Sequence, residues 1–275
     1  MQFNRKTIGH IYMVAFLLYL LLPLVVMSGA AFNASKLPTI IPWKGVTDEW
    51  FVALYNDNRI WIAFRNTIAV ALAVVVIAVP VGAAGAILVN SIGGRLRGVL
   101  YGLMVAPILV PGVVIGISTL LFWNQFSVGS GLHLSVLGQV SYIASFVMLL
   151  VLARLQSFDQ GLEEAALDLG ASHAQVMRRI LLPHLYPALG AGAAISFFQS
   201  IENFNVTLFT RGGADTLTVY VFSKVRSGIT PTINALAFLM IMVTILFAVA
   251  YETRRRRRVA IEAAREAEAR QAEAV

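Results

Sequence analysis

The sequence predicts an all-α, polytopic membrane protein with six transmembrane helices. Of its 275 residues, 58% are hydrophobic and only 13% are charged, and its mean hydropathy is +0.77. Soluble domains carry about a quarter charged residues, so this chain has too much apolar surface to bury inside a water-soluble globule. Six apolar stretches recur along it, each of about 20 residues or more, which suffices to cross a hydrocarbon core about 30 Å thick.

The first two spans enclose an aromatic outer segment. The first covers residues 9–32 and is expected to be a retained anchor, because its apolar run exceeds the roughly 7–15 residues of a signal-peptide core. Pro23 predicts a kink in it. Residues 33–64 are rich in tryptophan and tyrosine, which favours short helices at the periplasmic interface. The second span covers residues 66–89, and a short turn with two arginines follows it.

The third span, residues 99–123, is expected to be broken, because Pro107, Pro111 and Gly112 follow one another closely. A break inside a membrane is tolerated only where the freed backbone groups are buried in protein or face a cavity. Pro111 and Gly112 are therefore candidates for a substrate path, although close helix packing is the commoner use of such residues. The fourth span covers residues 134–152.

The last two spans lead into a charged tail. They cover residues 185–209 and 233–251, and five consecutive arginines from Arg254 to Arg258 come next. Such a run favours an anchor beside anionic membrane lipid over a nucleic-acid site. We therefore divide the chain into a transmembrane domain, residues 1–253, and a charged cytoplasmic tail, residues 254–275, which we expect to be a solvated helix.

The charges also predict the orientation. With both termini in the cytoplasm, the inner segments hold more lysine and arginine than the outer ones, and these charges lie close to the span ends. This is the distribution that the positive-inside rule requires. It places residues 154–186, the longest polar interruption between two spans, in the cytoplasm.

That interruption predicts two short amphipathic helices. An apolar stripe begins at Leu162, and Gly170 ends the first helix because glycine readily adopts a left-handed backbone. Ser172 and Gln175 have the spacing of a capping box, which restarts the chain as a second helix. Pro183 is expected to end that helix. Two helices at an angle could dock into a groove on a partner.

The residues Glu164-Ala165-Ala166, Gly170 and Ile180-x-Leu182-Pro183 together resemble the EAA loop of the membrane subunit of bacterial ABC importers. The resemblance implies the type I ABC importer permease fold, with this loop pressing as coupling helices on a separate ATP-hydrolysing subunit. An ordinary interfacial loop is the alternative. The residues expected to couple to the ATPase are Glu163, Glu164, Ala165, Ala166, Asp168, Leu169, Gly170, Ala171, Ser172, Ile180, Leu182 and Pro183.

Nothing in the sequence predicts an enzyme. It contains no Gly-Lys pair, and hence no phosphate-binding loop, and the motifs of zinc proteases and serine hydrolases are also absent. It has no cysteine, and its four histidines lack metal-ligand spacing. We expect no catalytic residue, metal or cofactor in this chain, with ATP and magnesium bound by the partner ATPase.

One carboxyl group falls inside an expected span. Glu202 lies near the outer end of the fifth span, and Ser196, Gln199 and Asn203 are expected to share a helical stripe beside it. An ionisable residue at that depth predicts a functional role, here in the substrate path. Hydrogen bonding between helices is the alternative role for these four polar residues.

Over most of its length the chain looks most similar to the spermidine/putrescine-type permeases. The matching stretches are residues 32–33, 111–118, 154–159, 200–204 and 231–235. In this chain Gly112 and Asn203 replace acidic residues that polyamine permeases usually carry. A polyamine such as putrescine or spermidine is the expected solute; an opine, phosphonate, thiamine or amino-acid derivative is the alternative, and a passive channel or scaffold is the rival from another class.

The resemblance also implies the partners. A second, similar permease subunit, two ATP-binding cassette subunits and a periplasmic solute-binding protein would complete the importer in the bacterial inner membrane. Membrane lipid is a further expected partner and nucleic acid is not.

Overall fold

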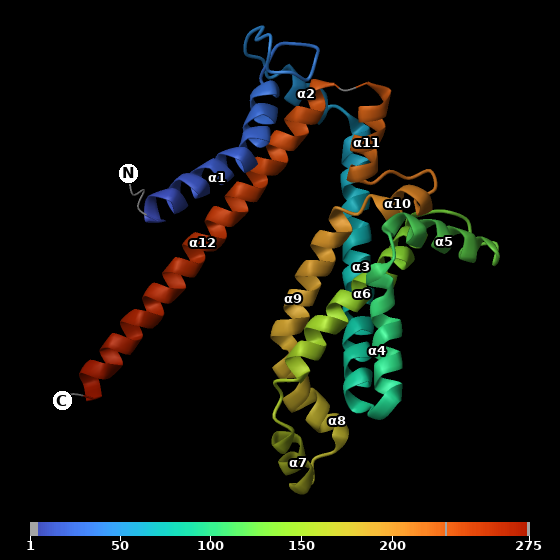
Figure 1. Ribbon diagram of the computed structural model, residues 1–275, viewed down its shortest axis with the longest axis vertical. Coiled ribbons are helices and arrows are strands. Elements are labelled where there is room, and N and C mark those ends of the chain that lie inside the picture. The colour runs from blue at the N-terminus through green and yellow to red at the C-terminus, as the bar shows by residue number, and fades with distance from the viewer. Residues whose placement is uncertain (1–4, 229, 274–275) are drawn as a thin grey trace. The chain divides into compact units, whose positions relative to one another are not determined.

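The computed structural model describes residues 5–228 and 230–273, and this part of the chain is almost entirely helical (Figure 1). The helices are α1 (Arg5–Ala30), α2 (Glu49–Tyr55), α3 (Asn58–Ser91), α4 (Gly94–Leu109), α5 (Gly112–Asn124), α6 (Leu132–Leu155), α7 (Gln160–Asp168), α8 (His173–Val176), the π-helical η1 (Met177–Leu181), α9 (Leu182–Ile201), α10 (Asn205–Thr210), α11 (Leu217–Ser227) and α12 (Pro231–Glu273).

Five stretches within the described residues are long and apolar enough to cross a membrane, and a sixth is obtained if α4 and α5 together form one broken span. The five are Ile8–Ala30, Asn58–Ser91, Leu132–Leu155, His173–Ile201 and Pro231–Ile261. Five of the expected spans are therefore found, and α4 with α5 lies where the third was expected.

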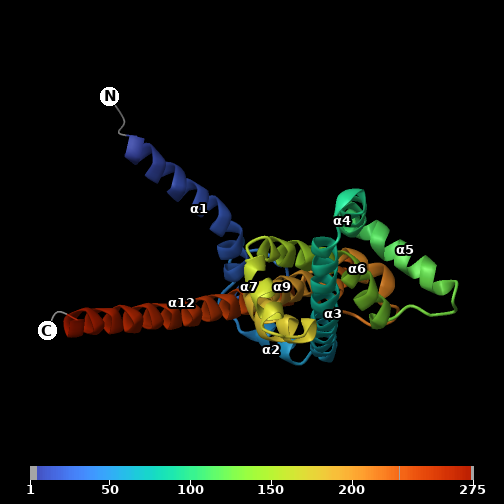
Figure 2. The same cartoon turned by 90° about the horizontal axis from the view of Figure 1, so that it is seen from below.

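The chain divides into two compact units, Asn58–Ser223 and a second made of Met1–Asp57 with Lys224–Val275. In the first unit α3, α6 and α9 pack on one another, with α6 crossing α3 obliquely (Figures 1 and 2). Small residues permit the close approach of α3 to α6. A Cβ at Gly82 would lie only 2.5 Å from the Ala144 carbonyl oxygen and 2.9 Å from the Met148 nitrogen.

The predicted break in the third span is confirmed. The axes of α4 and α5 differ by 105° across a two-residue connection. Val110 has an extended backbone, with φ −84° and ψ 128°, as expected for a residue before proline. Pro111 has no N–H to continue the helix, and it caps α5 by accepting from the N–H groups of Val114 and Ile115.

In the second unit, the segment between α1 and α2 is held by one buried asparagine. The Asn33 side chain donates to the carbonyl oxygens of Thr39 and Pro42 and accepts from the Lys44 N–H. Beside it, the rings of Phe32, Phe51 and Phe238 pack on one another with centroids 5.0–5.8 Å apart. These rings join the end of α1 to α2 and α12.

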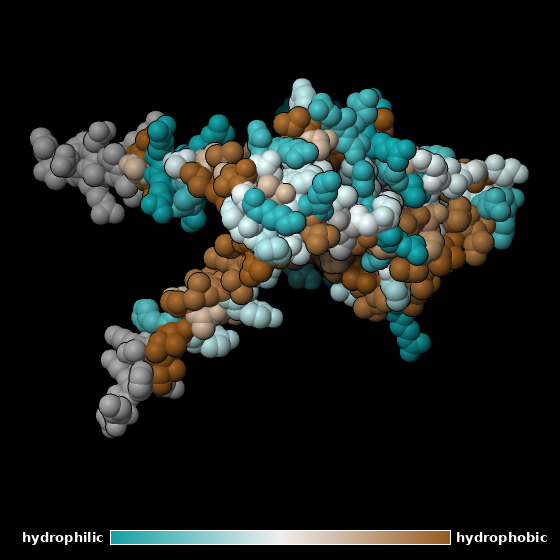
Figure 3. Space-filling view, turned by 90° about the horizontal axis from the view of Figure 1, so that it is seen from above, coloured by the Kyte–Doolittle hydropathy of each residue, from teal (hydrophilic) through white to brown (hydrophobic). Residues whose placement is uncertain are grey.

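The outer surfaces of the spans are apolar. Within Ile8–Ala30 only Ala30 is buried, and side chains such as Tyr12, Leu18 and Tyr19 are 65–80% exposed. Figure 3 shows a brown, hydrophobic surface along much of this helix and over α5. A surface of this kind requires lipid or another protein against it.

Several predicted boundaries are wrong. The helix of the second span starts at Asn58, so residues 58–64 belong to it rather than to separate interfacial helices. The fifth span ends at Ile201, and residues 205–210 form α10. The sequence also did not predict α11. The arginine run lies within α12, which continues helically to Glu273, as expected for the tail.

Candidate functional site

The α7–α8 region forms as the sequence predicted up to its last residues. Asp159 caps α7 by accepting from the Gly161 N–H. Gly170 follows α7 with φ +84°, a conformation that side chains disfavour. Both bonds of the capping box are present: Gln175 N–H donates to Ser172 Oγ at 3.3 Å, and Ser172 N–H donates to Gln175 Oε1 at 2.7 Å.

The turn between α7 and α8 presents an apolar side chain to solvent. Leu169 is 89% exposed, and Glu164, Ala165 and Asp168 are also exposed, whereas Ala166 is only half-buried. A shallow cleft of about 280 Å³ beside this turn is lined by Gly170, Ala171, Gln175, Val176, Arg179 and Ile180 together with Leu169. A fixed turn with an exposed leucine and flanking carboxylates suits docking against another protein.

Pro183 does not end the second helix, contrary to the sequence prediction. One continuous helix runs from His173 to Ile201 through α8, η1 and α9. Within it the Leu182 N–H donates to the Met177 carbonyl oxygen, five residues back. Pro183 cannot donate a hydrogen bond, and its ring would clash with the carbonyl four residues earlier in a regular α-helix. The wider π-helical turn just before it avoids an abrupt stop.

Arg154 and His184 attach the α7–α8 region to the spans. Arg154 Nε donates to the His184 carbonyl oxygen at 3.0 Å, and the His184 Nε2 lies 3.2 Å from the Arg154 carbonyl oxygen. The Phe158 ring packs against the His184 ring with centroids 5.2 Å apart. The two ends of the intervening segment are thus held together at the junction of α6 with α9.

A buried polar layer lies at the other end of α9. Gln139, in α6, is fully buried; its Nε2 donates to Thr207 Oγ1 at 2.9 Å, and its Oε1 accepts from Ser200 Oγ at 2.5 Å. Asn203 Nδ2 donates to the Tyr142 hydroxyl at 2.6 Å, while Asn203 Oδ1 accepts from the Val206 N–H. Through these bonds α6 fixes the bend between α9 and α10.

Glu202 lies in that bend. It is the C-cap of α9 and is exposed, so the expected stripe of Ser196, Gln199 and Asn203 is interrupted after Ile201. Ser196 is fully buried and its Oγ has no hydrogen-bond partner among the described residues, whereas Gln199 and Asn203 are half-buried. The exposed carboxylate and the buried hydroxyl therefore occupy different environments.

Pro111 and Gly112 lie where α5 packs against α10. A Cβ at Gly112 would be 3.0 Å from the Asn205 Cβ, and a Cβ at Gly116 would be 3.0 Å from the Val206 carbonyl oxygen. The two glycines allow α10 to approach α5 closely. The bent α4–α5 pair thereby comes next to the segment that carries Glu202.

Sequence reasoning missed Gln139, Tyr142 and Thr207. A glutamine within the otherwise apolar fourth span was a usable signal, because a polar side chain in a membrane needs a partner. Its partners on α9 and α10 could not be identified without the fold. Among the described residues no group of three or more histidine, aspartate or glutamate side chains is arranged to hold a metal ion.

Residues 78–257 match the family described as "Binding-protein-dependent transport system inner membrane component". The chain is 32% identical over 232 residues to the "Putrescine transport system permease protein PotI" of Escherichia coli, covering 81% of this chain and 82% of that protein. It is 28% identical over 247 residues to the "Spermidine/putrescine transport system permease protein PotC" of Haemophilus influenzae, covering 90% and 95%.

Solved structures share the architecture. A chain from a bacterial ABC transporter involved in the import of the acidic polysaccharide alginate superposes with a TM-score of 0.69 at 19% identity, covering 88% of this chain and 92% of that one. A chain of an amino acid ABC transporter with histidines gives a TM-score of 0.54 at 21% identity, covering 76% and 100%.

Proposed function

Because the chain belongs to the family of inner-membrane components of binding-protein-dependent transport systems, we propose that it passes a polyamine such as putrescine or spermidine into the cytoplasm. It is a permease subunit of an ABC importer and not an enzyme. The observation that carries the substrate proposal is the similarity to polyamine permeases over more than four fifths of the chain.

The site adds a physical argument for an amine. Glu202 is an exposed carboxylate at the end of a membrane-spanning helix, and the next residue, Asn203, donates to the Tyr142 hydroxyl. An exposed carboxylate at this place suits an ammonium group. We expect Glu202 and Asn203 to line the path, with Gln199, Ser196, Pro111 and Gly112 shaping it from the surrounding helices.

The substrate proposal has a competitor within the same machine. A polyamine carries several charges, and Gly112 offers no carboxylate to pair with a second ammonium group. An opine, a phosphonate, thiamine or an amino-acid derivative is therefore the second candidate. Uptake of labelled putrescine, spermidine and thiamine by cells with and without this chain separates the two, and import of thiamine alone contradicts the polyamine proposal.

Energy would come from another chain. We propose that the importer contains two ATP-binding cassette subunits, which bind ATP and magnesium, and a second permease subunit beside this one. One of the two ATP-binding cassette subunits docks on the exposed α7–α8 turn of this chain. A solute-binding protein would deliver the substrate from the periplasm. In this orientation both termini and residues 154–186 are cytoplasmic, as the arginine distribution favours.

Gly170 allows the coupling proposal to be tested. Its φ of +84° disfavours any side chain, so Gly170→Val should misplace α8 relative to α7. We expect uptake into proteoliposomes containing the whole importer to fall at least tenfold while ATP is still hydrolysed. Gly190→Val is the matched control, since a Cβ there meets no atom within 4 Å.

Normal transport by Gly170→Val contradicts the coupling role of this turn. Uptake that continues without ATP would instead favour a passive channel, the alternative from a different class. A complex that fails to assemble at all with Gly170→Val still supports docking at this turn, provided that Gly190→Val assembles normally.

A further inference from the structure

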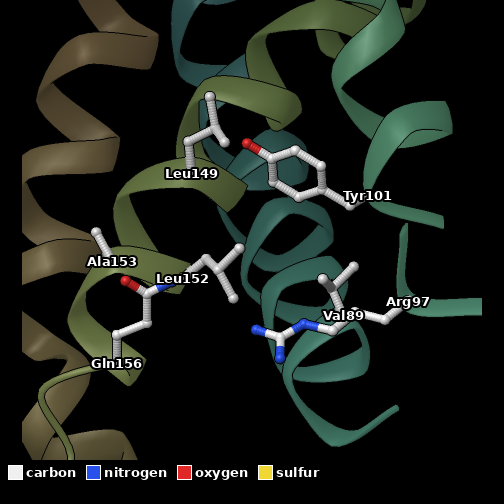
Figure 4. Close-up of a pocket in the computed structure, with 7 residues that line it drawn as sticks. All are labelled: Val89, Arg97, Tyr101, Leu149, Leu152, Ala153 and Gln156. Carbon is white, nitrogen blue, oxygen red and sulfur yellow. The ribbon is translucent and has the colours of Figure 1, made fainter. Parts of the chain in front are cut away.

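A cavity of about 260 Å³ lies between α4 and the end of α6 (Figure 4). Its lining is mixed: apolar residues such as Leu149 and Leu152 form part of it, and three exposed polar side chains form the rest, Arg97, Tyr101 and Gln156. Figure 4 shows the Arg97 guanidinium and the Gln156 amide directed toward the same space from different helices.

The three polar side chains are unused by the protein. None of them makes a side-chain hydrogen bond or ion pair with any residue that the structure describes, and no carboxylate lines the cavity. A guanidinium offers five N–H donors in a planar fork suited to phosphate oxygens, and the amide and hydroxyl add further donors. The site therefore has the charge and the donors for an anionic oxygen group.

The depth of the cavity identifies the source of that anion. Arg97 lies in the first turn of α4 and Gln156 follows the last residue of α6, so both are at helix ends, on the side of α7 and α8 (Figure 1). The ends of helices that cross a membrane lie near the level of the lipid headgroups. Exposed apolar side chains, Val99 and Leu103, continue along α4 toward the hydrocarbon core, where an acyl chain would lie.

We propose that this cavity binds the phosphate headgroup of an anionic phospholipid of the inner leaflet, with its acyl chains along α4. The leaflet assignment rests on the cytoplasmic orientation proposed above. Basic pockets between membrane helices on the cytoplasmic side are known to hold such headgroups. The lipid would also support α4, which contributes no fully buried residue of its own and leads into the sharp bend before α5.

Lipid titration of the full-length chain in detergent, followed by native mass spectrometry, tests the proposal. We expect phosphatidylglycerol to bind at least fivefold more tightly than phosphatidylcholine. A basic side chain near a membrane surface contributes about 1 kcal/mol to anionic-lipid binding, so Arg97→Gln should weaken phosphatidylglycerol about fivefold. Arg97→Lys should retain part of the affinity. Arg95→Gln removes an equal charge outside the cavity and should bind as the unaltered chain does.

Four results overturn the proposal. The first two are an equal loss of phosphatidylglycerol affinity in Arg95→Gln and Arg97→Gln, and an unchanged affinity in Arg97→Gln. The third is displacement of phosphatidylglycerol by millimolar inorganic phosphate. The fourth is an unchanged phosphatidylglycerol affinity when Ala153→Phe fills the cavity. If Ala153→Phe instead separates the chain from a co-purified membrane subunit without altering lipid binding, the cavity is a protein interface. The titration requires no transport, so a wrong substrate proposal would not affect its outcome.

Discussion

Replacing Gln139 with leucine should loosen the bend that carries Glu202. Gln139 is fully buried and joins α6 to both α9 and α10, through Ser200 and Thr207. Leucine has a similar size and keeps the apolar packing, but it can neither donate nor accept a hydrogen bond. Thr207 retains a weak bond of 3.4 Å to Asn203, whereas the buried Ser200 hydroxyl loses the partner that it has in this structure.

The expected cost follows from these two bonds. Hydrogen bonds between helices in membranes contribute about 0.6 kcal/mol on average and about 1.7 kcal/mol at most. Losing both hydrogen bonds therefore lowers the free energy of unfolding by about 1–3 kcal/mol. The double variant Gln139→Leu, Ser200→Ala also removes the unpaired Ser200 hydroxyl and should recover part of this stability. An unpaired buried polar group costs about 1–3 kcal/mol by itself.

The assay is unfolding of the purified chain in mixed micelles titrated with sodium dodecyl sulfate. Gln125→Leu is the control, since Gln125 is exposed at the end of α5 and the same chemical change there should alter stability by less than about 0.5 kcal/mol. The reasoning is refuted if Gln139→Leu is as stable as the unaltered chain, or if the double variant costs the sum of the two single ones.

Three further perturbations test other parts of the structure. Gly82→Leu should destabilise the chain by about 1–3 kcal/mol or more in the same titration, because its side chain would meet the backbone of α6; equal stability to Gly190→Leu would contradict this. Asn33→Ala should speed proteolytic cleavage within residues 34–48 at least fivefold. The three side-chain hydrogen bonds of Asn33 are lost, and with them about 1 kcal/mol or more of the free energy that holds this segment closed. An unchanged cleavage rate would show that other contacts hold the segment. Glu202→Gln should lower amine uptake about tenfold in cells, because the carboxylate would no longer pair with the ammonium group; unchanged uptake at all substrate concentrations excludes Glu202 from the path.

Features that depend on neighbouring residues could be predicted from the sequence. The spans follow from apolar length, the break before α5 from Pro107 and Pro111, and the turn after α7 from Gly170 and the Ser172 capping box. In each case a few adjacent side chains determine the local backbone. Family resemblance then supplied the remaining architecture.

The errors came from features that depend on the whole fold. Pro183 is a helix terminator by local rules, but the π-helical turn before it and packing on α6 keep the helix continuous. Helix α9 ends at Ile201 because Asn203 bonds to Tyr142 and to the start of α10, contacts that join distant parts of the chain. The partners of Gln139 were hidden for the same reason.

The continuous helix from His173 to Ile201 has a mechanical consequence. Its 29 residues at a rise of 1.5 Å give a rod about 43 Å long, of which α8 is one end and the bend with Glu202 the other. If this helix tilts by about 10° about its α8 end together with α3 and α6, on which it packs, its far end is displaced by about 7–8 Å without any change of backbone dihedral angles within the helix. Such leverage would be lost if a hinge replaced Pro183 and the π-helical turn, so the helical path across these residues determines how far a small rotation reaches.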